Sequence, residues 1–226
     1  MNMEHIITIA ALGPDSGDLL TMGALSAMKA ADTLILRTAR HGAVMILEEQ
    51  GVAYKTLDGL YERCEDFDEH AQAAAEAVGN AAAEGDVVYG VFDVRDRSVA
   101  ALMDRAKNVR VVAGPPAEGA LFARAQGSVQ MLEASDWEKY SLSSSRSALI
   151  RELDSRELAS EVKLKLMEIY PDETAVYVRM ADGTMAHTEL FNLDRVVAHG
   201  LSCTVACGIS PDQGWNQCSL HYKADS

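Results

Sequence analysis

The chain has 226 residues, of which 48% are hydrophobic, and a formal net charge of −14 at pH 7. This length suits one large domain or two small ones, and the charge argues against a nucleic-acid partner, because such binding relies on neutralising phosphates. No segment approaches the ~20 consecutive apolar residues that a membrane span needs, and the first apolar run lacks the basic flank of a signal peptide. We therefore expect a cytoplasmic protein that binds neither nucleic acid nor membranes.

The segment 6–36 predicts the opening of a parallel α/β sheet. An apolar, β-branched run over 6–12 ends in the turn-forming segment 13–18, which is rich in glycine and proline. A helical spacing of apolar residues follows as far as Met28, and a second apolar run covers 33–36. Ligands of such sheets lie beyond the carboxyl ends of the strands, so the 13–18 loop is a candidate site.

Helices and strands continue to alternate up to residue 113. The patterns predict helices over 43–49, 66–84 and 97–107, and strands over 86–91 and 109–113. The Gly-Pro-Pro cluster at 114–116 interrupts this alternation. We therefore predict an N-terminal α/β domain over 1–113, which carries the glycine loop, and a C-terminal α/β domain over 114–226.

The second half predicts a mixed sheet. Strands are expected over 129–132, 147–153, 174–180, 187–193 and 201–207, with a helix over 156–169. The pair Asp182-Gly183 is a hairpin signal between two of these strands, which would therefore run antiparallel.

The cysteines at the end of the chain raise the question of a metal site. Cys203 and Cys207, with His199 and Cys218 nearby, match zinc-site spacings only loosely. The intervening Thr204-Val205-Ala206 is more typical of a buried strand, in which cysteine is common. We therefore expect no metal.

Four stretches of the sequence resemble a known family. They are ALGPDSGDLLTMGAL at 11–25, LILRTARH at 34–41, GDVVYGV at 85–91, and ASEVKLKLMEIYPDE at 159–173, the last followed by LFNLDRV at 190–196. Together they resemble the tetrapyrrole (corrin/porphyrin) methylases. The 159–173 stretch resembles in particular the branch that is fused in front of a MazG-type nucleotide pyrophosphohydrolase.

The resemblance implies a methyltransferase that uses S-adenosylmethionine. It implies a homodimer of chains with two α/β domains, a mainly parallel N-terminal sheet, a mixed C-terminal sheet, and the cofactor in the cleft between the domains. The matching positions imply cofactor contacts from Leu12, Gly13 and Pro14, from Val91, Phe92 and Asp93, and from Gly114. No catalytic residue is implied, since methyl transfer is an in-line displacement that needs alignment and exclusion of water more than an acid or base.

Departures from the family pattern fall in these same loops. Ala11 and Asp15 stand where the first loop of the family has its outer glycines, and Pro115-Pro116 alter the junction turn. The segment 92–97 replaces a Pro-Gly-His-Pro-like turn with bulky and charged side chains. We predict that this segment weakens cofactor binding. Phe92 adds bulk beside the cleft. The charge of Asp93 would change the affinity in a direction that the sequence leaves open, since it either pairs with the cofactor's cationic groups or repels its carboxylate.

Several polar residues allow both a functional and a structural interpretation. Arg37, after the second strand, either lines the cleft or pairs with an acidic residue. Asp93 either belongs to the site or is an ordinary loop acid. His41 and His187 are more typical of structural histidines.

Two functions remain open, and the methyl acceptor is unspecified in both. The Gly13-Pro14 loop favours an active methyltransferase acting on a small-molecule substrate. The altered 92–97 segment favours a non-catalytic methylase fold, a scaffold or ligand sensor that partners a separate nucleotide pyrophosphohydrolase. An ordinary dinucleotide-binding domain is disfavoured, because the Gly-x-Gly-x-x-Gly fingerprint and its downstream acid are missing.

Overall fold

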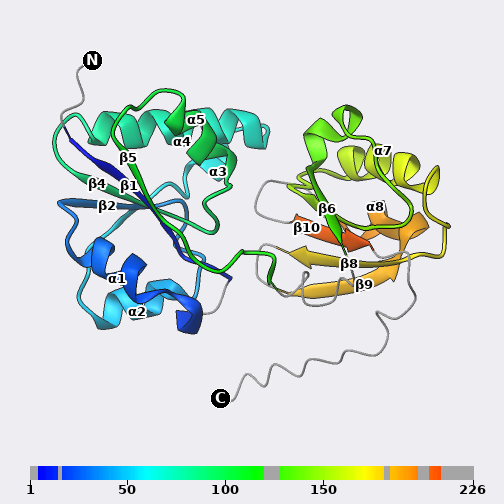
Figure 1. Cartoon of the computed structure of the whole chain (residues 1–226), viewed down its shortest axis with the longest axis horizontal. Helices are drawn as coiled ribbons and strands as arrows, with labels where there is room; N and C mark the ends of the chain where they lie inside the picture. Colours follow the sequence, from blue (N-terminus) through cyan, green and yellow to red (C-terminus); the bar gives the residue numbers. More distant parts are fainter. Residues whose placement is uncertain (1–4, 15–16, 120–127, 181–183, 198–203, 210–226) are drawn as a thin grey trace. The chain divides into compact units, whose positions relative to one another are not determined.

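The computed structural model describes residues 5–14, 17–119, 128–180 and 184–197, together with the backbone of 204–209. The chain divides into two compact units, Met1–Gly119 and Ala120–Ser226, and each has a five-stranded sheet of its own (Figure 1). In the part of the chain that the structure describes, no helix is long and apolar enough to cross a membrane.

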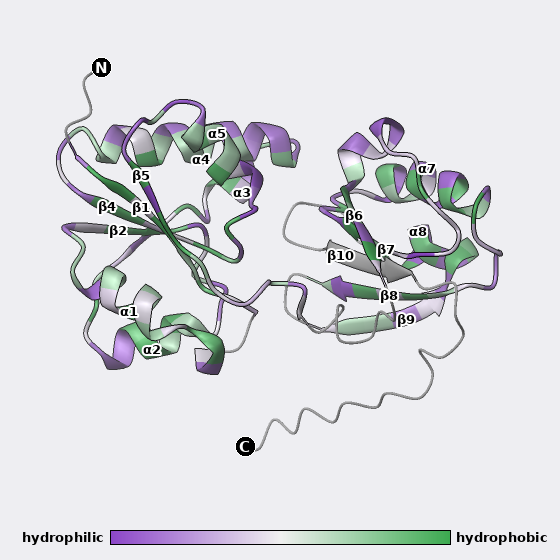
Figure 2. Ribbon diagram, in the orientation of Figure 1, coloured by the Kyte–Doolittle hydropathy of each residue, from purple (hydrophilic) through white to green (hydrophobic). Residues whose placement is uncertain are grey.

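The first unit is built on a parallel sheet. Its strands are β1 (Ile7–Ala11), β2 (Thr33–Leu36), β3 (Lys55–Thr56), β4 (Val87–Val91) and β5 (Val109–Val112). They lie in the order β3-β2-β4-β1-β5, and every pairing is parallel. β1 and β4 are buried along their whole length, as expected for strands covered on both faces, and Figure 2 shows them as largely hydrophobic.

Helices pack on both faces of this sheet (Figure 1). The elements are the 3-10 turn η1 (Gly17–Leu19) and the helices α1 (Met22–Lys29), α2 (Ala43–Glu49), α3 (Leu60–Arg63), α4 (Phe67–Ala81) and α5 (Arg97–Met103). Alternate residues of β1 face opposite ways: Ala10 packs in a core with α1 and α2, whereas Ile7 and Ile9 pack in a second core with α4 and α5. The first sheet is therefore the middle of three layers.

Side chains fix where two of these helices begin. Asp66 accepts a hydrogen bond from the backbone N–H of Glu69 at the start of α4. Asp96 accepts one from the backbone N–H of Ser98 at the start of α5. Aspartate is among the residues most favoured at this position, and the cap on α5 also ends the loop that follows β4.

The second unit has a mixed sheet. Its strands are β6 (Val129–Glu133), β7 (Ser147–Arg151), β8 (Ala175–Met180), β9 (Met185–Glu189) and β10 (Thr204–Ile209), in the order β6-β7-β10-β8-β9. β6 and β7 are parallel, and the other pairings are antiparallel.

Short helical elements and one long helix accompany this sheet. They are η2 (Ala134–Lys139), α7 (Arg156–Met167), η3 (Leu190–Asn192) and α8 (Leu193–Val196). The core of the unit forms where Val162 and Leu166 of α7 meet Ile150 of β7, Val178 of β8 and Leu193 of α8. α7 and α8 therefore cover the same sheet face.

The predicted architecture is confirmed, with a parallel first sheet and a mixed second one. The strand at 33–36 and the helix at 43–49 have the predicted bounds. β8 and β9 pair antiparallel, as the hairpin signal predicted, although residues 182–183 lie outside the described residues. Asp15, Cys203 and Cys218 also lie outside the described residues.

Some predicted ends are wrong. The strand predicted over 187–193 ends at Glu189, because Leu190 and Leu193 belong to helical turns that pack into the second core. The strand predicted over 147–153 ends at Arg151, because Glu152 has a left-handed backbone with φ of 58°, which no extended strand accommodates. The helix predicted over 97–107 ends at Met103.

Candidate functional site

Three loops meet at the carboxyl edge of the first sheet. The loop after β1 follows the loop after β4, because the Leu12 N–H donates to the Val91 carbonyl at 2.7 Å and the Gly13 N–H to the Phe92 carbonyl at 3.1 Å. The segment after β5 joins them: a Cβ placed on Gly114 would lie 3.1 Å from the Ala11 Cβ. The structure thus brings together the three segments in which the cofactor contacts were predicted.

Gly13 has the backbone that only glycine adopts easily. Its φ is +83°, and a Cβ there would lie 3.4 Å from the Leu19 carbonyl oxygen and 3.6 Å from the Pro115 side chain. Left-handed backbone is costly for residues with a Cβ. The glycine therefore permits the turn, and the segment after β5 packs beside it at ordinary contact distance.

His41 holds the first loop from the side of β2. The backbone N–H of Ala43 donates to its Nδ1 at 3.0 Å, so the ring proton sits on Nε2, which donates to the Gly13 carbonyl at 3.1 Å. Its ring also contacts the Phe92 ring edge-on, with centroids 5.0 Å apart. His41 is buried and hydrogen-bonded within the fold, and its structural interpretation stays a prediction. Its link to Gly13 was not predicted, because the two lie far apart in sequence.

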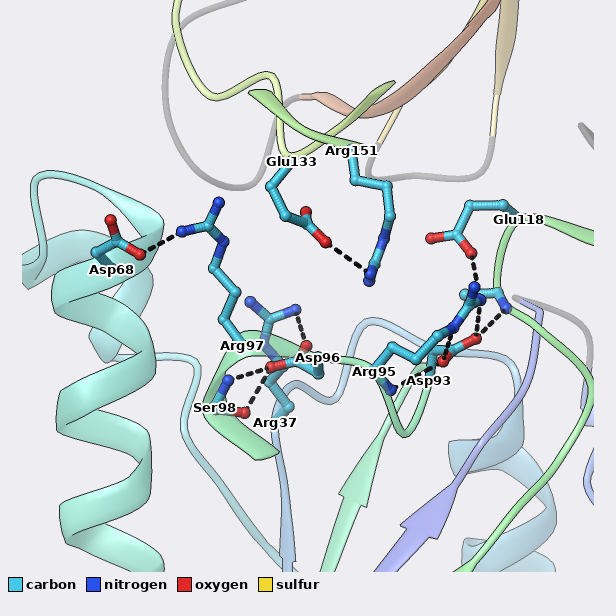
Figure 3. Close-up of polar contacts among 11 residues, drawn as sticks. Arg37, Asp68, Asp93, Arg95, Asp96, Arg97, Ser98, Glu118, Glu133 and Arg151 are labelled. Atoms are coloured by element: carbon cyan, nitrogen blue, oxygen red, sulfur yellow. Dashed lines mark hydrogen bonds and ion pairs between the residues drawn. The ribbon is translucent and has the colours of Figure 1, made fainter. Parts of the chain in front are cut away.

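Asp93 is held by four hydrogen bonds (Figure 3). Its Oδ1 accepts from the backbone N–H of Arg95 at 2.9 Å and from Arg95 Nε at 2.8 Å. Its Oδ2 accepts from the Arg95 guanidinium at 2.8 Å and from the Ala117 N–H at 3.1 Å. Burial alone raises the pKa of Asp93, but the bonds from Arg95 and Ala117 outweigh burial and lower that pKa to about 2. Asp93 is therefore ionised, and it is paired with Arg95 within the protein.

Glu118 completes this group from the segment after β5. The Arg95 guanidinium lies 3.3 Å from its Oε2, and the Glu118 side chain is only 2% exposed. With Gly114 and Ala117, it explains why the first unit extends to Gly119, beyond the predicted boundary after residue 113. The segment 114–118 therefore contacts the loops of the first sheet through Gly114, Ala117 and Glu118.

A second buried network lies beside the first. Asp96 accepts from Ser98 Oγ at 2.5 Å and pairs with the Arg37 guanidinium at 2.7 Å, and the Tyr89 hydroxyl lies 2.9 Å from Ser98 Oγ. Arg37 therefore pairs with an acidic residue, one of its two predicted roles, and this residue, Asp96, is buried. Its guanidinium also lies over the Tyr61 ring, a favourable cation–π arrangement.

The predicted site residues differ in what they present to the surface. Leu12, Gly13, Val91 and Asp93 are buried, whereas Pro14, Phe92 and Gly114 are partly exposed. Cofactor contacts from all seven remain predictions. Arg95 and Glu118 were not predicted as site residues. In the sequence they are only charged residues of two separate loops, and nothing there indicates that they pair.

The second unit carries a smaller polar group. Glu133 and Arg151, the last residues of the parallel strands β6 and β7, form an ion pair at 3.0 Å (Figure 3). Among the residues that the structure describes, no three His, Cys, Asp or Glu side chains are grouped as metal ligands.

Residues 7–195 match the family model of the Tetrapyrrole (Corrin/Porphyrin) Methylases. The chain is 31% identical to the uncharacterized protein YabN of Bacillus subtilis over 211 residues, which make up 87% of this chain and 43% of that protein. The chain thus spans less than half the length of that relative.

Two solved methyltransferases have the same fold. The uroporphyrin-III C-methyltransferase of Thermus thermophilus superposes with a TM-score of 0.62 at 16% identity, covering 92% of both chains. Cobalt precorrin-4 methyltransferase superposes with a TM-score of 0.57 at 14% identity, covering 91% of this chain and 95% of that one. At such identities the likeness shows the fold alone. The family model, which spans most of the chain, carries the assignment, and the protein belongs to the tetrapyrrole (corrin/porphyrin) methylases.

Proposed function

We propose that the protein is a methyltransferase that binds S-adenosylmethionine at the carboxyl edge of the first sheet. The observation that carries the proposal is the convergence of three loops, from β1, β4 and β5, at that edge. Ligands of open α/β sheets bind at this edge. Family membership makes methyl transfer the reaction to test first.

The residues present fit such a cofactor. S-adenosylmethionine carries a carboxylate but no phosphate, so it needs no cationic cradle. Asp93, which would repel that carboxylate if it stood alone, is paired with Arg95. Pro14, Phe92 and Gly114 are partly exposed, so each of the three loops offers surface to a ligand. When bound, the cofactor would supply an electrophilic methyl group for in-line displacement.

The chain's own residues would orient the reactants and keep water away. Gly13 permits the turn after β1, and Gly114 lets the segment after β5 approach closely. His41 and the buried Arg37–Asp96 pair hold the loops in place. Holding reactants in an aligned geometry supplies a large part of the rate enhancement in reactions of this kind.

Calorimetric titration of the full chain with S-adenosylmethionine and with its demethylated product tests the proposal. We expect both to bind, with one site per chain. Adenosine triphosphate serves as the control, and we expect it to bind far more weakly, because the loops lack the lysine of a phosphate-binding loop. Absence of binding at millimolar S-adenosylmethionine would refute the proposal.

A second candidate is a non-catalytic scaffold or ligand sensor. The observation that favours it is the 92–97 segment, whose acidic residues are both engaged inside the protein, Asp93 by Arg95 and Asp96 by Arg37. We propose a separate nucleotide pyrophosphohydrolase as the partner in that case, and co-elution of the two purified proteins as the test. For either function we propose a homodimer, which light scattering at micromolar concentration would reveal as twice the mass of one chain.

A further inference from the structure

Two buried carboxylates share one arginine at the carboxyl edge of the first sheet. The Asp93 and Glu118 side chains are 6% and 2% exposed, whereas that of Arg95 is 42% exposed. A carboxylate removed from water is costly unless it is paired and hydrogen-bonded. Arg95 supplies both acids with a charged partner.

The three residues connect segments that are distant in sequence. Asp93 and Arg95 belong to the loop after β4, whereas Glu118 belongs to the segment after β5. The connection is reinforced at the backbone, because the Ala117 N–H donates to Asp93 Oδ2 at 3.1 Å. Arg95 thus acts on both segments at once: it holds the Asp93 carboxylate in the orientation that accepts from Ala117, and it attracts Glu118.

The shape of the guanidinium suits this task. Nε and one terminal nitrogen of Arg95 donate to the two oxygens of Asp93, both at 2.8 Å. The same terminal nitrogen lies 3.3 Å from Glu118 (Figure 3). A planar fork makes such two-pronged contacts, and a lysine ammonium does not.

We infer that Arg95 is a positioning residue, which clasps the loop after β4 to the segment 114–118 and so orders the cofactor edge before any ligand arrives. This inference rests on the proposed function. A site whose loops are already ordered binds its ligand without the entropic cost of ordering them. Loss of the clasp therefore weakens cofactor binding even though Arg95 need not touch the cofactor.

Hydrogen exchange at the Ala117 amide, followed by NMR on the full chain, reads the clasp directly. Arg95→Met keeps the aliphatic stem and removes the guanidinium, and we expect exchange at Ala117 to become at least tenfold faster. Arg95→Lys should give an intermediate rate. Arg105→Ala is the control. Arg105 is exposed, follows the end of α5 and donates a hydrogen bond to Gln72 of α4. Its replacement should leave the exchange rate at Ala117 unchanged.

Glu118→Gln provides a milder variant in case Arg95→Met fails to fold. It removes one acid and leaves the Arg95–Asp93 contacts in place. We expect faster exchange in the segment 114–118 and little change in the loop after β4. Unchanged exchange at Ala117 in a folded Arg95→Met protein, or in Glu118→Gln if the first variant does not fold, would overturn the clasp.

Calorimetric titration of the same variants separates positioning from a purely structural role. We expect S-adenosylmethionine to bind Arg95→Met at least tenfold more weakly than the parent, and Arg95→Lys to recover part of that loss. Faster exchange with unchanged affinity would overturn the positioning role. If the parent protein does not bind the cofactor, the proposed function fails, and the exchange rate at Ala117 alone decides whether the clasp exists.

Discussion

His70 on α4 is fully buried, and neither of its ring nitrogens has a hydrogen-bond partner among the described residues. Its ring lies 4.4 Å from that of Tyr61, centroid to centroid. Burial and, to a smaller extent, the nearby Arg37 charge lower its pKa from 6.5 to about 4, although Asp96 opposes them. A buried polar ring without partners costs stability at every pH, and more so in acid.

We predict that His70→Leu stabilises the protein. At pH 7 the gain should be about 1–3 kcal/mol, the usual cost of a buried unsatisfied polar group. Because the folded-state pKa of His70 lies below 6.5, the unfolded chain takes up the proton first as the pH falls, so the parent loses stability between pH 6.5 and 4, by at most about 1.4 kcal/mol per pH unit. Urea unfolding across this range checks both statements, and equal acid loss in parent and variant would contradict the second.

The folded structure favours the charged form of Asp93, whereas it disfavours the charged form of His70. The folded-state pKa of Asp93, about 2, lies below the ordinary 3.8, so its stabilising effect is complete above pH 3.8 and disappears as the pH falls toward 2. We predict that Asp93→Asn lowers the free energy of unfolding at pH 7 by on the order of 2 kcal/mol. The difference from the parent should shrink below pH 3. Glu138→Gln, at an exposed position of the second unit, should change neither value in the same urea titration.

Gly13 and Gly51 share a left-handed backbone but lie in different loops. A Cβ on Gly13 would make ordinary contacts, 3.4 Å from the Leu19 carbonyl oxygen, and one on Gly51 would have no neighbour within 4 Å. We predict that Gly13→Ala and Gly51→Ala each cost about 1–2 kcal/mol from backbone strain. Only Gly13→Ala should also weaken S-adenosylmethionine binding, because Gly13 lies in the loop after β1. Urea unfolding and calorimetric titration check the two statements, and a much larger stability loss for one variant would contradict the first.

Elements with clear limits were predicted well from the sequence. The strand at 33–36 and the helix at 43–49 are apolar segments that end at polar residues or at glycine. The strand predicted over 187–193 failed in its second half, because Leu190 and Leu193 satisfy a strand pattern equally well but pack as helical turns against the second core. Periodicity over so few residues does not distinguish the two.

The location of the candidate site was predictable, whereas its internal contacts were not. Parallel strands place their carboxyl ends at one edge, so the loops after β1 and β4 had to meet. The pairing of Arg95 with Glu118, and of His41 with Gly13, joins residues that sequence spacing does not relate. The expected effect of Asp93 on cofactor binding stays a prediction. Because its carboxylate is paired with Arg95, we expect that effect to act through the loop.

Among the described residues, each hydrophobic core draws its members from one unit. The two cores of the first unit draw on residues up to Val112, and the main core of the second on residues from Leu132. We predict two unfolding transitions in calorimetry. Leu47→Ala, in a core of the first unit, should lower one, and Leu166→Ala, in the core of the second, should lower the other, each by about 2–5 kcal/mol. A single transition that both variants shift equally would contradict this.

The order of strands in the first sheet also affects how the chain folds during its synthesis. β1 lies between β4 and β5 and pairs with them from Val87 and Val109 onward. It therefore leaves the ribosome well before either neighbour exists. During that interval a largely apolar strand has two unpaired edges, the condition under which chains associate wrongly. Efficient production of this protein should thus depend on chaperones that shelter the nascent β1, a requirement that arises from the route to the fold.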